Sequence, residues 1–355
     1  MSRFFSEKLS KLTAYVPGEQ PQGREYVKLN TNESPFPPPK PVLDAVAEAA
    51  GKANLYSDPE ATLLKEKIAQ LYHIQPENVL PVNGSDEVLY FAFLAFGDET
   101  HPFACPEISY GFYPVFGAIT QVPVKQIPLA KDFSIDYRDY LGLNQNIVIA
   151  NPNAPTGLTL SPKEIEEILS SNRDHVVVID EAYVDFGGES VVPLIAKYEN
   201  LLVTQTFSKS RSLAGARLGF GFGQKELIQD LNTVKYSINP YNVNRMTQAA
   251  GVAAIACEEI YQDHCQAVQS AREFTAQRLR ELGFTVLPSK ANFLFAKKEG
   301  LKGEDFYQGL KERGVLIRHF AKAEIADWCR ISIGSQGQME RFLAETEGLL
   351  REKGC

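Results

Sequence analysis

Short apolar runs recur through the middle of the chain and indicate buried strands. The three clearest are NIVIA at 146–150, VVVI at 176–179 and LLVTQT at 201–206. Apolar runs of this length, without alternation, are typical of strands covered on both faces. Between the first two, residues 161–169 (SPKEIEEIL) combine a serine N-cap, a proline in the first turn and a glutamate that completes a capping box. This strand–helix–strand order predicts an α/β fold with a mostly parallel sheet and helices on both faces.

The regions on either side of this core follow other patterns. The proline-rich residues 34–41 (SPFPPPKP) exclude a helix there, and we expect an N-terminal arm. Helical patterning resumes at Val42, and residues 86–96 (DEVLYFAFLAF) predict a buried helix. A long helical pattern then runs from about residue 244 to residue 282.

The pattern changes again after residue 282. We expect two strands around residues 288–289, a helix at 303–313, strands at 315–318 and 329–333, and a final helix. This α+β tail indicates a second, smaller domain. The prediction is an arm with part of the small domain at 1–45, a large domain at 46–275 and a small C-terminal domain at 276–355.

Composition and charge narrow the class of protein. The formal net charge of −8 argues against a nucleic-acid-binding protein, which usually presents a basic face. The five cysteines are an odd number without a CxxC pair, which favours a reducing compartment, and no Cys/His spacing suggests a metal site. The N-terminus shows no signal-peptide pattern, and the apolar runs are far shorter than the roughly 20 residues that span a bilayer. We therefore expect a cytoplasmic protein that binds no metal, membrane or nucleic acid.

Candidate chemistry follows the ends of the predicted strands. Ligands of parallel α/β sheets bind at the carboxyl ends of the strands. Four segments with polar side chains lie at such ends: 83–86 (NGSD), 151–157 (NPNAPTG), 180–183 (DEAY) and 206–209 (TFSK). We expect them to converge on one edge of the sheet.

Lys209 is the central candidate in these segments. Its neighbours Thr206, Ser208 and Arg217 provide two hydroxyls and a second cation, a combination that suits a phosphate. A nearby cation also favours the neutral amine of Lys209, which is the form that makes a Schiff base. The structural alternative is a solvated surface lysine.

Asp180 ends an apolar strand and could hold the protonated ring nitrogen of a pyridine cofactor. Tyr183 could then donate to the phenolic oxygen of the same ring. The alternative for Asp180 is a simple turn cap. The turn formed by Gly84, Ser85 and Asp86 opens a helix, and the free N–H groups at a helix start bind phosphate. Further along, Tyr110 could stack on an aromatic ring, or it could be a core residue.

These motifs, in this order and spacing, resemble the fold-type-I family of pyridoxal-5′-phosphate (PLP) enzymes. NPNAPTG, DEAY and TFSKSRSLAGARLG carry that resemblance. KLNTNESPFPP, NLYSDPE, NGSDE, VLIRHF and CRISIG also resemble the histidinol-phosphate aminotransferase subgroup. The resemblance covers nearly the whole chain, and it implies a large domain with a seven-stranded sheet plus a smaller α+β domain.

The resemblance also implies a role for each matching residue. Lys209 would carry PLP as a Schiff base and move a proton between the substrate and the cofactor. The implied cofactor-binding set is Gly84, Ser85, Asp86, Tyr110, Asn153, Asp180, Tyr183, Thr206, Ser208, Lys209 and Arg217. Tyr56 would reach the cofactor phosphate of a neighbouring subunit, since these enzymes form homodimers with shared sites. The family motif usually has Asn directly before Pro-Thr-Gly, where this chain has Ala154, so Asn153 could take over its role.

The substrate is suggested by Arg318 and Arg330, which lie on two neighbouring predicted strands. Two guanidinium groups suit a dianionic phosphate better than a single carboxylate, although Arg318 could instead form a surface ion pair. The resemblance adds Tyr15 and Asn32 on the N-terminal arm. The predicted reaction converts L-histidinol phosphate and 2-oxoglutarate into imidazole-acetol phosphate and glutamate, a step of histidine biosynthesis.

Two alternatives on the same scaffold remain open: an aromatic amino-acid aminotransferase and a phosphothreonine decarboxylase. Two other classes are excluded by spacing. VVVIDE resembles the acidic strand end of a P-loop ATPase, but no GxxxxGK[ST] motif precedes it. A nicotinamide dehydrogenase would need GxGxxG, whereas Gly219, Gly221 and Gly223 only alternate and predict a tightly packed strand.

Overall fold

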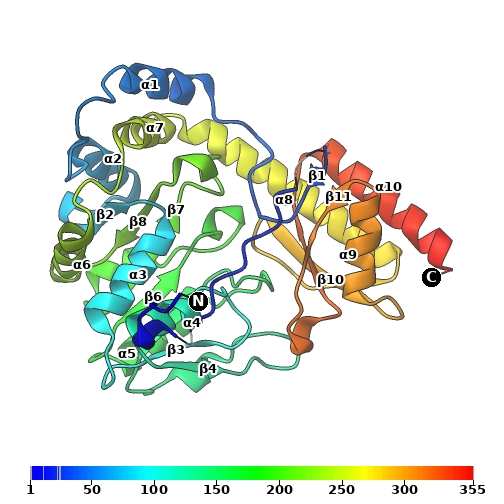
Figure 1. Cartoon of the computed structure of the whole chain (residues 1–355), viewed down its shortest axis with the longest axis horizontal. Helices are drawn as coiled ribbons and strands as arrows, with labels where there is room; N and C mark the ends of the chain where they lie inside the picture. Colours follow the sequence, from blue (N-terminus) through cyan, green and yellow to red (C-terminus); the bar gives the residue numbers. More distant parts are fainter. Residues whose placement is uncertain (1, 11, 22, 24, 355) are drawn as a thin grey trace.

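The computed structural model describes residues 2–10, 12–21, 23 and 25–354. Within these residues a seven-stranded sheet forms the centre of the larger half of the molecule, in the order β2-β8-β7-β6-β5-β3-β4 (Figure 1). Its strands are β2 (Val79–Val82), β3 (Phe103–Pro106), β4 (Val124–Ile127), β5 (Asn146–Ala150), β6 (Val177–Asp180), β7 (Leu201–Thr206) and β8 (Gly219–Phe222). All pairs are parallel except those of β8, which is antiparallel to both β2 and β7. The predicted mostly parallel sheet is confirmed.

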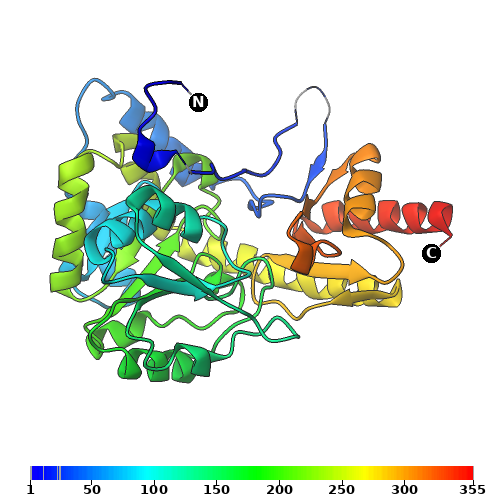
Figure 2. The same cartoon turned by 60° about the horizontal axis from the view of Figure 1, so that its bottom comes forward.

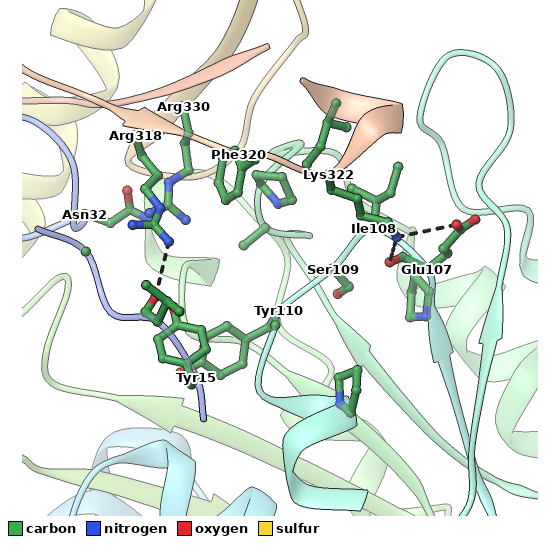
Figure 3. A pocket seen from close by; sticks show the side chains of 18 of the residues that line it. Tyr15, Asn32, Glu107, Ile108, Ser109, Tyr110, Arg318, Phe320, Lys322 and Arg330 are labelled. Carbon is green, nitrogen blue, oxygen red and sulfur yellow. Dashed lines mark hydrogen bonds and ion pairs between the residues drawn. The ribbon is translucent and has the colours of Figure 1, made fainter. Parts of the chain in front are cut away.

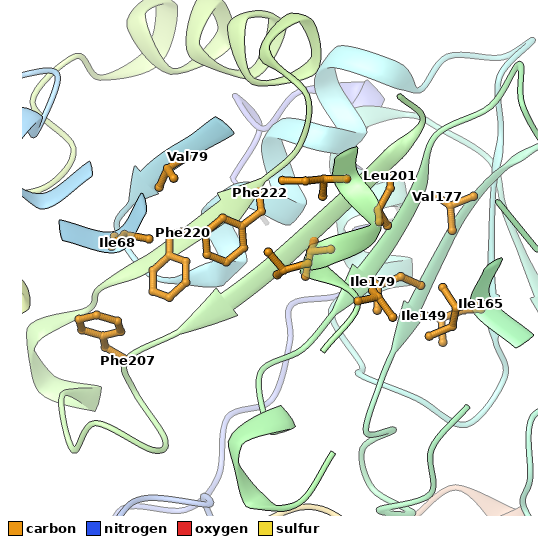
Figure 4. Packing of buried hydrophobic residues seen from close by; sticks show 14 of the residues in the cluster. Ile68, Val79, Ile149, Ile165, Val177, Ile179, Leu201, Phe207, Phe220 and Phe222 are labelled. Atoms are coloured by element: carbon orange, nitrogen blue, oxygen red, sulfur yellow. The ribbon is translucent and has the colours of Figure 1, made fainter. Parts of the chain in front are cut away.

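Alternate residues of the central strands face opposite layers. Ile147, Ile149, Val177, Ile179 and Leu201 belong to one apolar cluster, and the apolar side chains between them belong to a second. Figure 4 shows part of the first cluster. Every residue of β5, β6 and β7 is buried. Burying each valine, leucine or isoleucine side chain of these strands contributes about 1.5–3 kcal/mol, so the apolar strands hold the polar groups at the edge of the sheet in place.

Helices cover both faces of this sheet. One face packs against α1 (Lys40–Ala50), α2 (Thr62–Tyr72), α5 (Pro162–Ser171) and α7 (Arg245–Ile255), and the other against α3 (Ser85–Phe96), α4 (Tyr113–Thr120) and α6 (Lys225–Ile238). The predicted capping box is present, since Glu164 N donates to Ser161 Oγ and Ser161 N donates to Glu164 Oε2. Helix α1 begins at Lys40, within the stretch expected to be irregular, because Pro41 is tolerated in a first helical turn.

The smaller half is built on an antiparallel sheet in the order β12-β13-β10-β9. Its elements are β9 (Phe284–Val286), β10 (Phe293–Lys298), α9 (Gly303–Glu312), β12 (Arg318–His319), β13 (Cys329–Ser332) and α10 (Gln336–Lys353). A separate parallel pair joins β1 (Val27–Lys28) to β11 (Val315–Leu316), so the N-terminal arm packs with the C-terminal half. The strand expected at 315–318 is wrong in one respect: it divides into β11 and β12, which join different sheets.

The long helix α8 (Glu258–Glu281) connects the two halves, as Figure 2 shows. Its first turns pack with the central sheet through Tyr261, and its later turns pack in the C-terminal apolar cluster from Cys265 to Leu279. The helical stretch expected at 244–282 is therefore interrupted, since α7 ends at Ile255 and α8 begins at Glu258. The division into domains at residues 275 and 276 stays a prediction.

The sequence also led to expectations about cysteines, membrane spans and metal sites. The four cysteines that the structure describes are free and buried, and Cys355 lies outside the described residues. In the described part of the chain, no helix is both long and apolar enough to cross a membrane. The same residues contain no cluster of three or more His, Cys, Asp or Glu side chains placed to hold a metal ion.

Candidate active site

The four polar segments predicted from the strand ends meet at one edge of the central sheet. Two adjoining cavities lie there and share Tyr110, Ala154, Tyr183 and Lys209. The inner cavity, of about 90 Å³, is lined in addition by Ser85, Asp86, Ala150, Asp180, Ala182, Thr206, Ser208 and Arg217. The outer cavity, of about 580 Å³, includes Tyr15, Asn32, Arg318 and Arg330. Residues separated by up to 315 positions in sequence are thus brought to one site.

Lys209 lies at the junction of the two cavities. It follows β7 in an irregular segment, and its amine makes one long hydrogen bond, from Nζ to the carbonyl of Thr31 at 3.4 Å. The same amine lies 5.8 Å from the centre of the Tyr183 ring. Because this contact is weak, the amine is available to a ligand that enters either cavity.

Asp180 forms the floor of the inner cavity at the end of β6. The side chain is 5% exposed, and its Oδ2 accepts a hydrogen bond from the Tyr113 hydroxyl at 3.0 Å while Oδ1 accepts one from Ala182 N at 3.2 Å. Burial raises the pKa of Asp180 to about 6, against the lowering effects of the Tyr113 hydrogen bond and of the Lys209 charge. A cation placed beside this carboxylate would offset its desolvation.

The opposite end of the inner cavity is a cradle at the start of α3. Gly84 has φ +83°, and a Cβ on it would lie 2.5 Å from Arg217 Nη2. Gly219 in β8 allows an equally close approach, since a Cβ there would lie 2.3 Å from Ser85 N. The Arg217 guanidinium lies 3.5 Å from Ser208 Oγ and 3.6 Å from Asp86 Oδ2. Helix-start N–H groups, hydroxyls and a guanidinium on one wall fit a phosphate group.

Arg318 and Arg330 lie side by side in the outer cavity, as Figure 3 shows. Arg318 donates to the carbonyls of Val16 and Pro17 at 3.2 and 3.3 Å, and it forms no ion pair among the described residues, so the alternative of a surface ion pair is not supported. Arg330 donates to the carbonyl of Asn30 at 3.1 Å, while its buried Nε has no partner among the described atoms. Burial lowers the pKa of Arg330, as expected for a desolvated cation.

Aromatic side chains enclose the space between the arginines and Lys209. Tyr15 stacks on Phe112 with ring centres 4.2 Å apart and lies 6.3 Å from Tyr110. The Tyr110 hydroxyl donates to Asp86 Oδ1 at 2.8 Å, and the Tyr183 hydroxyl accepts from Asn32 Nδ2 at 3.0 Å. The N-terminal segment that carries Tyr15 and Asn32 therefore meets residues 110–112 and 183 at the cavity itself.

Three residues of the predicted set do not line either cavity. Gly84 contributes backbone geometry alone. Asn153 is fully buried and its amide is occupied, since Nδ2 donates to Ile108 O and Thr156 Oγ1 while Oδ1 accepts from Ser109 Oγ. Its cofactor role stays a prediction, and Ala154 lines both cavities instead. Tyr56 lies on the surface, 77% exposed, and stacks on Tyr241.

The sequence pattern also missed residues that complete the site. Tyr113 supports Asp180 from the first turn of α4, but a tyrosine in an aromatic-rich stretch carries no distinguishing signal. Lys322 closes the far side of the outer cavity by donating to the Glu107 carbonyl at 3.0 Å and pairing with its carboxylate at 3.4 Å (Figure 3). These two residues are 215 positions apart, so their contact depends on the fold.

Comparisons with known proteins agree with this geometry. The family model described as aminotransferase class I and II matches residues 24–345, and the chain belongs to this family. The resemblance to the histidinol-phosphate aminotransferases is confirmed at the level of sequence. A protein of that name from Brachyspira hyodysenteriae is 45% identical over 353 residues, covering 99% of this chain and 100% of the relative. One from Acinetobacter baumannii is 47% identical over 345 residues, covering 96% of each chain.

A solved structure supports the fold. The histidinol-phosphate aminotransferase of Sinorhizobium meliloti, in complex with pyridoxal-5′-phosphate, superposes with a TM-score of 0.89, covers 99% of each chain and is 23% identical. The fold-type-I architecture, with its seven-stranded sheet, is therefore confirmed.

Proposed function

We propose that this protein transfers the amino group of L-histidinol phosphate to 2-oxoglutarate with PLP as its cofactor. The observation that carries the proposal is the pair of arginines, Arg318 and Arg330, in a cavity that opens directly onto Lys209. The relatives at 44–47% identity that bear the name of this activity support the same conclusion.

The inner cavity suits PLP at both of its ends. The buried Asp180 carboxylate forms no ion pair with any described residue, although the Lys209 charge acts on it, and a protonated ring nitrogen would supply a direct cationic partner. The helix start at Ser85, together with Thr206, Ser208 and Arg217, would hold the phosphate, and Tyr110 and Tyr183 would contact the ring. When bound, PLP supplies the aldehyde that accepts the amino group and a ring that stabilises negative charge at the reacting carbon.

Side chains of the protein would then bind the substrate and transfer the proton. Arg318 and Arg330 would exchange their hydrogen bonds to the arm and to Asn30 for stronger ones to the substrate phosphate. This fixes the substrate amine near Lys209, whose Nζ would remove the proton from the substrate Cα and return it to the cofactor side. The same arginines would bind the carboxylates of 2-oxoglutarate, so the two substrates would use the site in turn.

We also propose a homodimer that forms in the cytoplasm. Large apolar side chains are exposed around α2, α6 and their connections, namely Leu55, Tyr56, Leu63, Tyr236, Ile238 and Tyr241. Clusters of exposed apolar side chains are typical of protein–protein interfaces. In a dimer formed through this surface, Tyr56 would be placed to reach the partner's phosphate cradle. Sedimentation of the purified protein at micromolar concentration should give the mass of two chains.

The substrate is tested by comparing turnover of L-histidinol phosphate, phenylalanine and phosphothreonine with 2-oxoglutarate as acceptor. We expect the highest kcat/KM for histidinol phosphate, because it alone combines a phosphate with a transferable amine and an aromatic ring. A preference for phenylalanine would instead identify an aromatic aminotransferase, and release of carbon dioxide from phosphothreonine would identify a decarboxylase.

A further inference from the structure

The segment that carries Lys209 is not held by regular secondary structure. Between β7 and β8, backbone hydrogen bonds fix its two ends, from Phe207 N to Leu218 O at 2.9 Å and from Leu213 N to Phe207 O at 3.0 Å. Lys209 lies between these bonds, where the placement of the chain depends on side chains. Its neighbours on the C-terminal side, Ser210 and Arg211, are both buried.

Arg211 is a buried cation that lines neither cavity. It is 3% exposed, and its guanidinium donates to Asp185 Oδ2 at 3.1 Å and to Glu258 Oε2 at 2.7 Å. Its charged carbon lies 5.0 Å from the centre of the Phe207 ring, so the guanidinium also packs on its own segment. The hydroxyl of Ser210 donates to the same carboxylate oxygen of Asp185.

The two carboxylates belong to elements that frame the site. Asp185 lies in the short helix η4 (Val184–Phe186), five residues after Asp180, and Glu258 is the first residue of α8. Although burial alone would lower the pKa of the Arg211 guanidinium, Asp185 and Glu258 raise it above its usual value. Arg211 is therefore charged, and it ties the Lys209 segment both to the chain after β6 and to the helix that connects the two halves.

We propose that Arg211 is a positioning residue for Lys209. The ion pairs with Asp185 and Glu258 fix the backbone of residues 207–213, and this sets the direction in which the Lys209 amine enters the junction of the two cavities. A buried ion pair contributes little net stability compared with apolar packing, but losing one partner leaves the others uncompensated. The inference rests on the proposed role of Lys209, because positioning matters only if that amine reacts.

The experiment compares Arg211→Met with a matched control, Arg272→Met. Arg272 is also 3% exposed and lies in α8, where it donates to the carbonyls of Phe186 and Ala291, pairs with Glu273 and forms no hydrogen bond or ion pair with the described residues 207–213. Both variants lose one buried guanidinium, so both are expected to unfold at a lower temperature than the wild type. Only the loss of Arg211 should make residues 207–213, the segment that carries Lys209, less firmly held.

The decisive readout is amide hydrogen exchange of the full chain, measured with and without PLP on peptides that cover residues 207–213. We expect Arg211→Met to raise exchange there on the order of tenfold through local opening, and Arg272→Met to leave these peptides unchanged. In the holoenzyme, Arg211→Met should lower kcat on the order of 10–100-fold with little change in KM, since misplacement of a reacting group acts on the chemical step.

Two further variants keep the proposal testable if Arg211→Met fails to fold. Arg211→Lys keeps the charge but lacks the fork that reaches two carboxylates, and we expect an effect between wild type and Arg211→Met. Glu258→Gln should shift exchange in the same direction. If Arg211→Met had the same amide exchange and the same kcat as the wild type, the proposal would be overturned. An equal effect of Arg272→Met on the exchange of the 207–213 peptides would also overturn it. Because the exchange measurement needs no substrate, an error in the proposed reaction would leave its outcome intact and would show separately as absent turnover.

Discussion

Arg318 and Arg330 are directly opposed residues of two antiparallel strands, with their Cα atoms paired in the register of β12 and β13. Like charges opposite each other destabilise a strand pair, so this arrangement costs stability in the absence of a ligand. Backbone carbonyls of Val16, Pro17 and Asn30 compensate in part. An anion between the two guanidiniums would offset the repulsion, and this is the physical basis for the proposal that they bind the substrate.

The first prediction concerns these arginines. Arg330→Met should lower kcat/KM for histidinol phosphate about 10–150-fold, the equivalent of about 1.5–3 kcal/mol for a hydrogen bond to a charged group. Arg318→Met should act in the same direction and leave the unliganded protein as stable as the wild type or more so, since one of two like charges is gone. Arg341→Met, which removes an exposed arginine of α10 paired with Glu345, is the control and should leave kcat/KM unchanged. Wild-type kinetics in Arg330→Met would contradict the assignment.

The second prediction concerns Lys209. Lys209→Ala should fold with nearly wild-type stability, because the amine makes only the 3.4 Å hydrogen bond to Thr31. Turnover should be lost, since no other described amine lines the inner cavity. The change should also remove the visible absorbance that depends on this lysine while PLP still binds through Asp180 and the phosphate cradle. Thermal unfolding and single-turnover kinetics measure the two effects, and full activity in the variant would rule out the proposed role.

Much of the site was predictable because it follows a local rule. Asp180, Ser208 and Lys209 come directly after apolar strands, and the carboxyl ends of parallel strands meet at one edge whatever the rest of the chain does. The buried strands were also predictable, since β5 and β7 have the bounds that the apolar runs indicate. For these residues sequence order is enough to imply spatial proximity.

What the sequence could not provide depends on tertiary placement. The direction of β8 is one case: GFGF indicates a strand, but its antiparallel course follows from a connection, residues 207–218, that contains no α-helix to carry it back across the sheet. Tyr113 is another, because its hydroxyl meets Asp180 across 67 positions. The amide of Asn153 is occupied by Thr156 of the same motif and by Ile108 and Ser109, and the motif cannot position these last two residues.

The third prediction concerns the phosphate cradle. Gly84→Ala should weaken PLP binding, because the added Cβ would lie 2.5 Å from Arg217 Nη2 and push that guanidinium away from Ser208. With φ 83° and ψ 151°, Gly84 has a conformation that is essentially restricted to glycine, so alanine there adds a backbone cost of about 1–3 kcal/mol. Gly215→Ala is a suitable control, since a Cβ there meets nothing within 4 Å. Titration of the apoprotein with PLP, followed by fluorescence, should show a higher Kd for Gly84→Ala alone. Equal Kd values for the two variants would indicate that Arg217 does not hold the phosphate.

The last prediction concerns pH and Asp180. Burial raises the pKa of Asp180 to about 6, from a usual value of 3.8, so the folded apoprotein binds more protons than the unfolded chain between these values. Its stability should therefore fall as pH rises from about 4 to 6, by about 3 kcal/mol at most, and stay lower above pH 6. Asp180→Asn removes this ionisation while keeping an oxygen that can accept from Tyr113. The unliganded variant should come closest to the wild type below about pH 4 and exceed it at pH 8.

Urea unfolding of both apoproteins across this pH range measures the difference in their free energies of unfolding. The other titrating groups are the same in both proteins, so their effects cancel. Glu181 is one of them, and burial raises its pKa to about 7. Bound PLP should reverse the order at pH 8, because a protonated ring nitrogen lowers the Asp180 pKa and stabilises the wild type but not Asp180→Asn. If PLP stabilised both proteins equally at pH 8, Asp180 would not be the partner of the cofactor ring. The carboxylate is thus expected to cost stability in the apoprotein and to provide affinity in the holoenzyme, as a buried charge does when its partner is a ligand.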